Sequence, residues 1–243
     1  MNEGNESSKY FYIRLFGDLA LFADPVSKGG GERISYPVPT AQALIGIVDA
    51  CYFKPTIKNV IDEVKVINPI EFRTIGYRSL FNNYSAGLNY ITALTNVEYL
   101  IKFHFEWNLQ REDLKRDRII QKHEALMKRS IDKGGRRDLF LGVREFVGYV
   151  ESMDAQEYQN TTSYYAGSTH HFGILFHSFA YPKNSKEKLK SYFTRTSMEN
   201  GIIKIKKQTE CEIINELASS YTIKSSKTIR SVVDELSAYE RGE

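Results

Sequence analysis

A strict alternation of side-chain type between Tyr99 and Leu109 constrains the fold more than any other feature of the chain. Six apolar residues alternate there with a mostly polar set: Tyr99, Ile101, Phe103, Phe105, Trp107 and Leu109 against Leu100, Lys102, His104, Glu106 and Asn108. Successive side chains of a strand point to opposite faces, so a period of two predicts a strand with one buried face. The chain must therefore build a sheet that other elements cover on one side.

Two amphipathic helices are predicted to provide that cover. The first starts at Thr40, a suitable N-cap, and ends before Pro55. Its apolar face is formed by residues at i, i+3, i+4 and i+7: Leu44, Ile47, Val48 and Cys51. The second helix is expected over residues 118–133, because Gly134-Gly135 would end it.

Further strands are expected at residues 10–16, 64–73 and 144–151, with Pro69 interrupting the second. The order β, α, β, β, α, β is the split βαβ, or ferredoxin-like, arrangement also found in RRM domains. It predicts an N-terminal domain over residues 1–155. A smaller β-rich domain is expected over 156–243, where Asn200-Gly201 is a hairpin signal. The predicted fold class is α+β.

The positive charge of the chain is local. The net charge is only +3, but the window from Arg111 to Arg144 holds eleven cations and six anions, which leaves −2 for the rest. Such a patch is typical of a surface that binds a polyanion, and a sheet with nearby aromatic residues suits RNA. A solvated helix face is the alternative. The residues predicted to contact RNA phosphates are Arg111, Lys115, Arg116, Arg118, Lys128, Arg129, Lys133, Arg136 and Arg137.

One histidine in this window, His123, lies on the apolar stripe of the second helix, where a packed histidine is the common case. Two features favour chemistry instead. Lys122 adjoins it, and both fall in the first turns of the helix, where unpaired N–H groups and the helix dipole attract anions. A proton acceptor beside a fixed cation suits a reaction at phosphate. Tyr52, at the margin of the first helix, is a third candidate, with a purely structural tyrosine as its alternative.

Other residue types exclude several classes of site. Cys51 and Cys211 are far apart and are expected to be reduced thiols, not a disulfide or a zinc site. The histidines His170, His171 and His177 lack carboxylate or cysteine partners at ligand spacing, so no metal is predicted. The glycines at 29–31 match no nucleotide-binding fingerprint, and no cofactor is expected.

The chain shows no sign of membrane insertion. Its start, MNEGNESSKYF, lacks the apolar region of a signal peptide, and no apolar run approaches the roughly 20 residues that span a bilayer. A cytoplasmic protein without membrane contact is expected.

Two long stretches resemble a known family. FGDLALFADPVSKGGGERISYPVPTAQALIGIVDACYFKP (Phe16 to Pro55) is similar to the N-terminal signature of the "Cas five" CRISPR-associated proteins. KHEALMKRSIDKGGRRDLFLGVREFVGYV (Lys122 to Val150) resembles the matching region of their subtype I-C, or "d", branch, which belongs to the RAMP superfamily. The resemblance covers most of the chain and weakens toward the C-terminus.

The resemblance implies an endoribonuclease that cuts the repeat hairpin of CRISPR precursor RNA and stays in the type I-C interference complex (Cascade) with its other subunits. It implies a tyrosine–lysine–histidine set, which here matches Tyr52, Lys122 and His123. Without a predicted metal, the economical route is attack by the ribose 2′-hydroxyl, which leaves a 2′,3′-cyclic phosphate. Which of His123 and Tyr52 is acid or base stays open. The alternative is a non-catalytic RNA-binding subunit of that complex, and DNA contact there is possible.

Overall fold

The structure is a computed structural model of the 243-residue chain, and it describes residues 7–23, 27, 32–80, 86–182, 187–217 and 232–241. The helices are α1 (Ala41–Cys51), α2 (Ile120–Asp132), α3 (Ala155–Asn160) and α4 (Val232–Glu240), with 3₁₀ turns η2 (Glu112–Asp117) and η3 (Gln208–Glu210). The strands are β1 (Phe11–Ala20), β2 (Arg33–Ile34), β3 (Ile57–Val66), β4 (Phe72–Leu80), β5 (Ala86–Trp107), β6 (Leu139–Phe140), β7 (Val147–Met153), β8 (Thr169–Ala180), β9 (Lys190–Glu199), β10 (Ile202–Lys204) and β11 (Ile213–Glu216).

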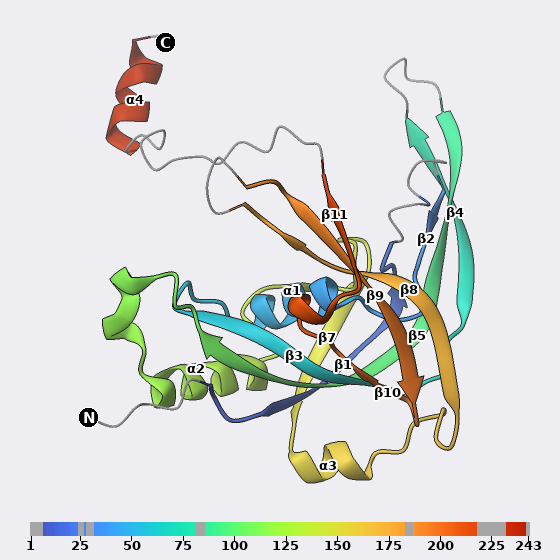
Figure 1. Cartoon of the computed structure of the whole chain (residues 1–243). Coiled ribbons are helices and arrows are strands. Elements are labelled where there is room, and N and C mark those ends of the chain that lie inside the picture. Colours follow the sequence, from blue (N-terminus) through green and yellow to red (C-terminus); the bar gives the residue numbers. More distant parts are fainter. Residues whose placement is uncertain are drawn as a thin grey trace.

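These strands form one curled sheet that wraps around α1 (Figure 1). Its order is β11-β9-β10-β3-β5-β1-β7-β6, with β2 and β4 paired to β5 and β8 paired to β9. The pairs between these strands are antiparallel except for β2 with β5. The fold is therefore a mixed one of helices and mostly antiparallel strands, as the α+β prediction requires.

The alternating segment is the centre of the sheet. Tyr99, Ile101, Phe103 and Phe105 are buried on one face of β5, which confirms the predicted strand. β5 is longer than predicted, at 22 residues, because its first half pairs with β4 from Phe72 opposite Leu94 to Leu80 opposite Ala86. The two strands form an arm that projects from the body of the molecule (Figure 1).

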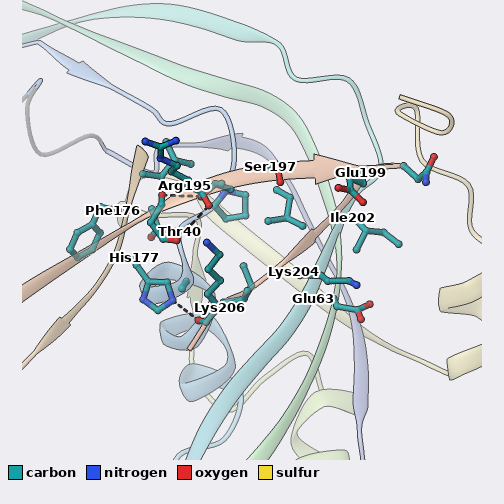
Figure 2. Close-up of a pocket in the computed structure, with 18 residues that line it drawn as sticks. Thr40, Glu63, Phe176, His177, Arg195, Ser197, Glu199, Ile202, Lys204 and Lys206 are labelled. Carbon is teal, nitrogen blue, oxygen red and sulfur yellow. Dashed lines mark hydrogen bonds between the residues drawn. The ribbon is translucent and has the colours of Figure 1, made fainter. Parts of the chain in front are cut away.

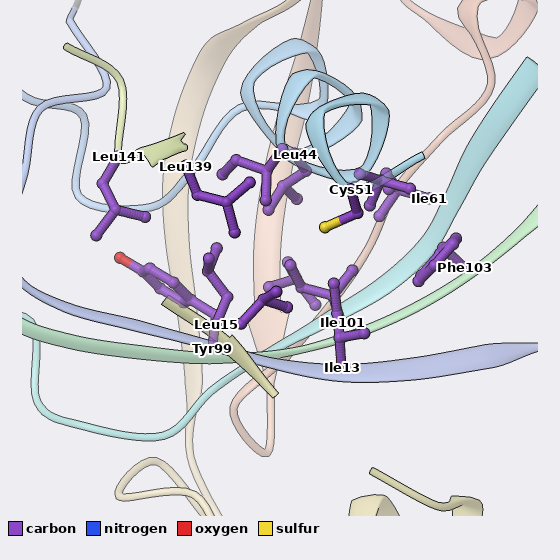
Figure 3. Packing of buried hydrophobic residues seen from close by; sticks show 14 of the residues in the cluster. Ile13, Leu15, Leu44, Cys51, Ile61, Tyr99, Ile101, Phe103, Leu139 and Leu141 are labelled. Carbon is purple, nitrogen blue, oxygen red and sulfur yellow. The ribbon is translucent and has the colours of Figure 1, made fainter. Parts of the chain in front are cut away.

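Both predicted helices pack on the buried face of this sheet. The Thr40 side chain caps α1 by accepting a hydrogen bond from the Ala43 N–H at 3.3 Å, as predicted. Leu44 and Cys51 of α1 pack against Ile13 and Ile101 of the sheet (Figure 3), and α2 adds Met127 and other residues to the same core. α2 ends where Gly134 and Gly135 take positive φ values. It starts two residues later than predicted, because η2 and its exit occupy the preceding turn.

The strand predicted at 64–73, with Pro69 interrupting it, is only partly correct. Two strands occupy this region, with β3 ending at Val66 and β4 beginning at Phe72. Pro69 lies in the link between them, because proline cannot donate to a ladder, and both strands pair with β5 on either side of this break. The expected strand at 144–151 begins later, at Val147. The sequence analysis missed α3, whose start at Asp154 is fixed by a capping box with Glu157.

The C-terminal strands continue the same sheet. Asn200 and Gly201 take φ values of 52° and 80° between β9 and β10, which confirms the hairpin predicted there. β10 pairs with β3, and Leu175, Met198 and Ile203 belong to the main core. The glycines at 29 to 31 lie outside the described residues. Within the described part of the chain, no helix is long and apolar enough to span a membrane.

Candidate active site

Tyr52 is held in place by the end of α1. It is the C-cap residue, and its backbone N–H donates to the Val48 carbonyl at 2.9 Å. Its own carbonyl accepts from the Asn59 amide at 3.1 Å, and that amide also donates to Asp49 at 2.8 Å. The backbone at Tyr52 is therefore bonded on both sides, which fixes the direction of the phenol.

His123 lies in the first turn of α2, on the buried face that the sequence predicted. Its backbone N–H donates to the Ile119 carbonyl at 3.3 Å. The rings of Phe105 and Trp107 meet the imidazole edge-on, with centroids 6.1 and 5.7 Å away. The side chain has no exposed surface (0%), so it contacts only other protein groups.

The two side chains meet through a buried hydrogen bond. The Tyr52 hydroxyl lies 2.9 Å from His123 Nδ1, although 71 residues separate them in sequence. The other ring nitrogen, Nε2, lies 2.8 Å from the main-chain oxygen of Asp117. A carbonyl oxygen can only accept, so Nε2 carries the proton in this arrangement. In the neutral ring, Nδ1 is then the acceptor, and the Tyr52 hydroxyl donates to it.

Lys122 joins this pair through Asp117. The Asp117 carboxylate accepts from the Lys122 ammonium and, at 2.7 Å, from the Thr56 hydroxyl. It also lies 3.4 Å from His123 Nε2. The Lys122 ammonium, followed by the Thr56 hydrogen bond, holds the pKa of Asp117 below its usual range. The structure thus brings together all three residues predicted to be catalytic.

Only part of this cluster faces solvent. The Lys122 side chain is 44% exposed and the Asp117 side chain is 32% exposed, whereas Tyr52 is only 4% exposed. Burial raises the pKa of Tyr52, the Asp117 charge raises it further, and the Arg136 charge opposes both. The charge of Arg136, a residue predicted only to bind RNA, therefore also lowers the pKa of the Tyr52 phenol.

The predicted RNA-binding residues lie mostly on the surface around α2. All except Arg118 are exposed: Arg111, Lys115, Arg116, Lys128, Arg129, Lys133, Arg136 and Arg137. Lys128 pairs with Asp132 and Arg111 with Asp113. Arg118 differs from the prediction, because its side chain is 12% exposed and donates to the Asn108 and Arg111 carbonyls at 3.2 Å. Arg118 holds the turn before α2 together.

The sequence analysis missed Asp117 and Thr56. Neither residue falls on a periodic element, since Asp117 ends η2 and Thr56 lies in the turn before β3. Their link spans 61 residues, a separation that local spacing cannot reveal. The one available signal was an acidic residue close before Lys122-His123 in an otherwise basic stretch.

A separate cleft of about 490 Å³ lies at the other end of α1 (Figure 2). Arg195, Lys204 and Lys206 line it together with Thr40, the N-cap of α1. A helix rises about 1.5 Å per residue, so α1 holds its two ends about 16 Å apart. The cleft is therefore distinct from the Tyr52–His123 site.

His170 and His177 have hydrogen-bond partners within the protein, and both cysteines are buried. His177 is buried, and its ring nitrogens lie 2.8 Å from the Ser178 hydroxyl and the Lys206 carbonyl. His170 contacts Ser168. Cys51 and Cys211 are free and buried, and burial raises the pKa of Cys51 to about 12. No group of three potential metal ligands occurs among the residues that the structure describes.

Known proteins resemble this chain over most of its length. The family model described as "CRISPR-associated protein (Cas_Cas5)", of the Cas5d type, matches residues 11–206. A relative from Mannheimia succiniciproducens, named CRISPR pre-crRNA endoribonuclease Cas5d, is 26% identical over 218 residues, covering 79% of this chain and 93% of the relative. A second relative of that name, from Thermus thermophilus, is 25% identical over 155 residues, covering 59% and 64%.

Solved structures agree with this result. A functionally uncharacterized protein from Streptococcus mutans is 52% identical, with a TM-score of 0.76, and the match covers 87% of this chain and all of the other. A crystal structure described only as a CRISPR-associated protein is 50% identical, with a TM-score of 0.74 and the same coverage. The family match spans well over half of the chain. The chain therefore belongs to the Cas5d branch of the CRISPR-associated Cas5 family.

Proposed function

We propose that this protein is an endoribonuclease that cleaves the repeat hairpin of CRISPR precursor RNA without a metal ion. The observation that carries the proposal is the 2.9 Å contact between the Tyr52 hydroxyl and His123 Nδ1, beside the Lys122 ammonium. A phenol, an imidazole and an ammonium group from two distant segments form one cluster. The names of the curated relatives, CRISPR pre-crRNA endoribonucleases, support the same substrate.

The hydrogen-bond directions support one proton path. His123 Nδ1 is the acceptor, so it takes the Tyr52 proton while the phenol oxygen takes the proton of the ribose 2′-hydroxyl. The 2′-oxygen then attacks the adjacent phosphorus, and the bond from phosphorus to the 5′-oxygen breaks. The products are a 2′,3′-cyclic phosphate and a 5′-oxygen that is protonated by water. The imidazolium returns its proton through Tyr52 to solvent.

Lys122 supplies the positive charge that this reaction needs. Attack adds negative charge to the phosphoryl oxygens, and a fixed cation stabilises that charge more in the transition state than in the ground state. The ammonium is the most exposed member of the cluster and lies where RNA can approach it. The exposed cations around α2 would hold the flanking phosphates.

The second candidate is a non-catalytic RNA-binding subunit. The observation that favours it is the burial of His123, whose two nitrogens are both bonded within the protein. The burial of His123 is compatible with the catalytic proposal, because His123 would act through Tyr52 and needs no direct contact with RNA. The two functions differ in one respect that can be measured, which is whether the isolated protein cuts RNA.

The test is to incubate the protein with the repeat RNA of its own locus in the presence of EDTA. We expect one cut and a 2′,3′-cyclic phosphate end. A single 2′-deoxy substitution at the cut site should abolish cleavage and leave binding nearly unchanged. A strict requirement for magnesium would contradict the metal-free mechanism, and binding without any cleavage would favour the non-catalytic subunit.

The strand order is consistent with the finer prediction of the N-terminal fold. The order β3-β5-β1-β7, with α1 and α2 on one face, supports a ferredoxin-like unit within residues 1–155. The β-rich unit over 156–243 stays a prediction, since β10 joins its strands to β3. Membership of the type I-C interference complex is proposed from the family, and DNA contact within that complex is proposed from the basic surface around α2. A cytoplasmic location is proposed with it.

A further inference from the structure

We infer that Asp117 is a positioning residue of this site and that Thr56 supports it. The inference rests on the proposed ribonuclease function and adds two residues to the predicted set of three. Asp117 contacts both Lys122 and His123, and Thr56 contacts Asp117. None of the sequence motifs contains this pair.

The Thr56–Asp117 hydrogen bond closes the site between its two halves. Thr56 follows Tyr52 by four residues, in the turn that leads from α1 to β3. Asp117 precedes Lys122 and His123, at the end of η2. The bond of 2.7 Å therefore ties the segment that carries the phenol to the segment that carries the ammonium and the imidazole. Thr56 is 1% exposed, so water competes little for its hydroxyl.

Asp117 orients each of its neighbours in a different way. Its carboxylate holds the Lys122 ammonium, which would otherwise move freely on a flexible side chain. Its main-chain oxygen accepts from His123 Nε2, which leaves Nδ1 free to accept the Tyr52 proton. The carboxylate, 3.4 Å from Nε2, also stabilises positive charge on the ring after that transfer.

A carboxylate beside a phosphate-binding cation has an electrostatic cost. It repels RNA phosphates, so it weakens binding even if it favours the reaction. Nearby acids lack this arrangement: Asp113 pairs with Arg111, Glu112 with Arg118 and Asp132 with Lys128. Among the acids that the structure describes, Asp117 is the one that contacts both Lys122 and His123. A positioning role therefore predicts slower cleavage without weaker binding when its charge is removed.

The first experiment compares Asp117→Asn with Asp113→Asn, using single-turnover cleavage of the repeat RNA. We expect the Asp117 variant to cleave on the order of 10²-fold more slowly, because small displacements of reacting groups cost about that much. Its affinity for RNA should stay equal or rise. Asp113→Asn, on the same 3₁₀ turn, should leave the cleavage rate at saturating protein unchanged and should raise affinity slightly, because it removes a negative charge beside Arg111. Partial recovery of the rate in Asp117→Glu would support the carboxylate as the cause.

A second pair of variants tests Thr56. Thr56→Val removes the hydroxyl at nearly constant volume, and Thr56→Ser retains it. We expect Thr56→Val to slow cleavage and Thr56→Ser to change the cleavage rate little. If Thr56 acts through Asp117, Thr56→Val should slow the Asp117→Asn protein far less than it slows the wild type. Fully additive effects would contradict the shared link.

The outcomes separate this inference from the proposed function. An unchanged or faster rate in Asp117→Asn overturns the inference, as does a loss of rate that matches a loss of affinity. If wild-type protein does not cleave, the proposed function fails, and NMR of the His123 ring nitrogens decides the inference. The Nε2 proton should be present in both proteins, because the main-chain acceptor is retained, and a shifted Nε2 signal in Asp117→Asn, from loss of the carboxylate 3.4 Å away, supports it. Identical ring signals in the two proteins overturn it.

Discussion

His123 and His177 are two buried histidines bonded in the same pattern. In each ring, Nε2 lies 2.8 Å from a main-chain oxygen, and Nδ1 lies within 2.9 Å of a hydroxyl. The partners differ. Tyr52 comes from a distant segment and is an ionisable phenol, whereas Ser178 is the next residue in the chain and already accepts from Gln208 at 2.8 Å.

The comparison shows that burial and satisfied hydrogen bonds do not separate the proposed catalytic histidine from a structural one. The difference lies in what surrounds the hydroxyl partner. The Tyr52–His123 pair adjoins a half-exposed lysine and a carboxylate, while His177 lies at the edge of a cleft whose Lys206 pairs with Glu212. Variants at both histidines and at the surrounding charges test this contrast.

Replacing each histidine by alanine should give opposite results. His123→Ala removes the proton acceptor, so cleavage should fall by about 10²–10⁴-fold while hairpin binding persists. His177→Ala should leave the cleavage rate per folded molecule unchanged. Single-turnover assays with circular dichroism of both variants provide the measurement. Loss of the folded state in His123→Ala would identify His123 as a structural residue.

Lys122→Ala tests the charged part of the site. Without the ammonium, stabilisation of the phosphorane is lost, and cleavage should slow by on the order of 10²–10³-fold. The measurement is the rate at saturating protein, which isolates the chemical step from binding. A useful control is Lys128→Ala, whose side chain is exposed on the same helix and pairs with Asp132. That variant should affect affinity more than the saturated rate.

The basic surface around α2 should contribute to binding and not to chemistry. Arg137→Ala should weaken hairpin binding severalfold and reduce the slope of log K against log salt by about 1. Lys188→Ala, which removes an exposed cation paired with Glu216 in the C-terminal part, should leave both unchanged. Titrations at several salt concentrations measure the two slopes. Equal slopes in the two variants would contradict a local RNA-binding surface.

The smallest expected effect concerns stability at acidic pH. Burial lowers the pKa of His177 below its ordinary 6.5, so the unfolded chain binds this proton more readily than the folded protein does. His177 therefore lowers the free energy of unfolding as the pH falls through about 6.5. Compared with wild type, His177→Asn should therefore lose less stability between pH 7.5 and 5.5, measured as a smaller decrease in Tm.

His104 should act in the opposite direction in the same measurement. Its hydrogen bond to Asp62 raises its pKa, so its contribution to stability is present below pH 6.5 and is lost as the pH rises through the folded value. His104→Asn should therefore lose more stability than wild type as the pH falls. If Tm depends on pH equally in wild type, His177→Asn and His104→Asn, the opposite pKa shifts of His177 and His104 are refuted.

Much of the fold follows from local patterns. The alternation from Tyr99 predicted β5, the spacing from Leu44 to Cys51 predicted α1, and Asn200-Gly201 predicted the β9–β10 hairpin. Each pattern fixes which face of a single element is buried. The arm formed by β4 and the first half of β5 was missed, because the side chains at 72–78 and 87–90 are exposed or only partly buried.

The candidate site divides in the same way. Tyr52, Lys122 and His123 were found from residue type, from position on a helix and from resemblance to a family. Their hydrogen-bond partners Thr56 and Asp117 lie in turns, where periodicity gives no information. Arg118 was assigned to the surface by its charge, whereas the structure uses it to hold main-chain carbonyls.

The sequence by itself determined the main elements of the central sheet, the burial of His123 on a helix face and the local excess of positive charge. The tertiary structure alone decided which ring nitrogen of His123 faces the phenol and which carboxylate holds Lys122. The physical reason is that a pattern along the chain sets the direction of a side chain from its own element. Partners 61 and 71 residues apart are set only when the sheet brings α1 and α2 together.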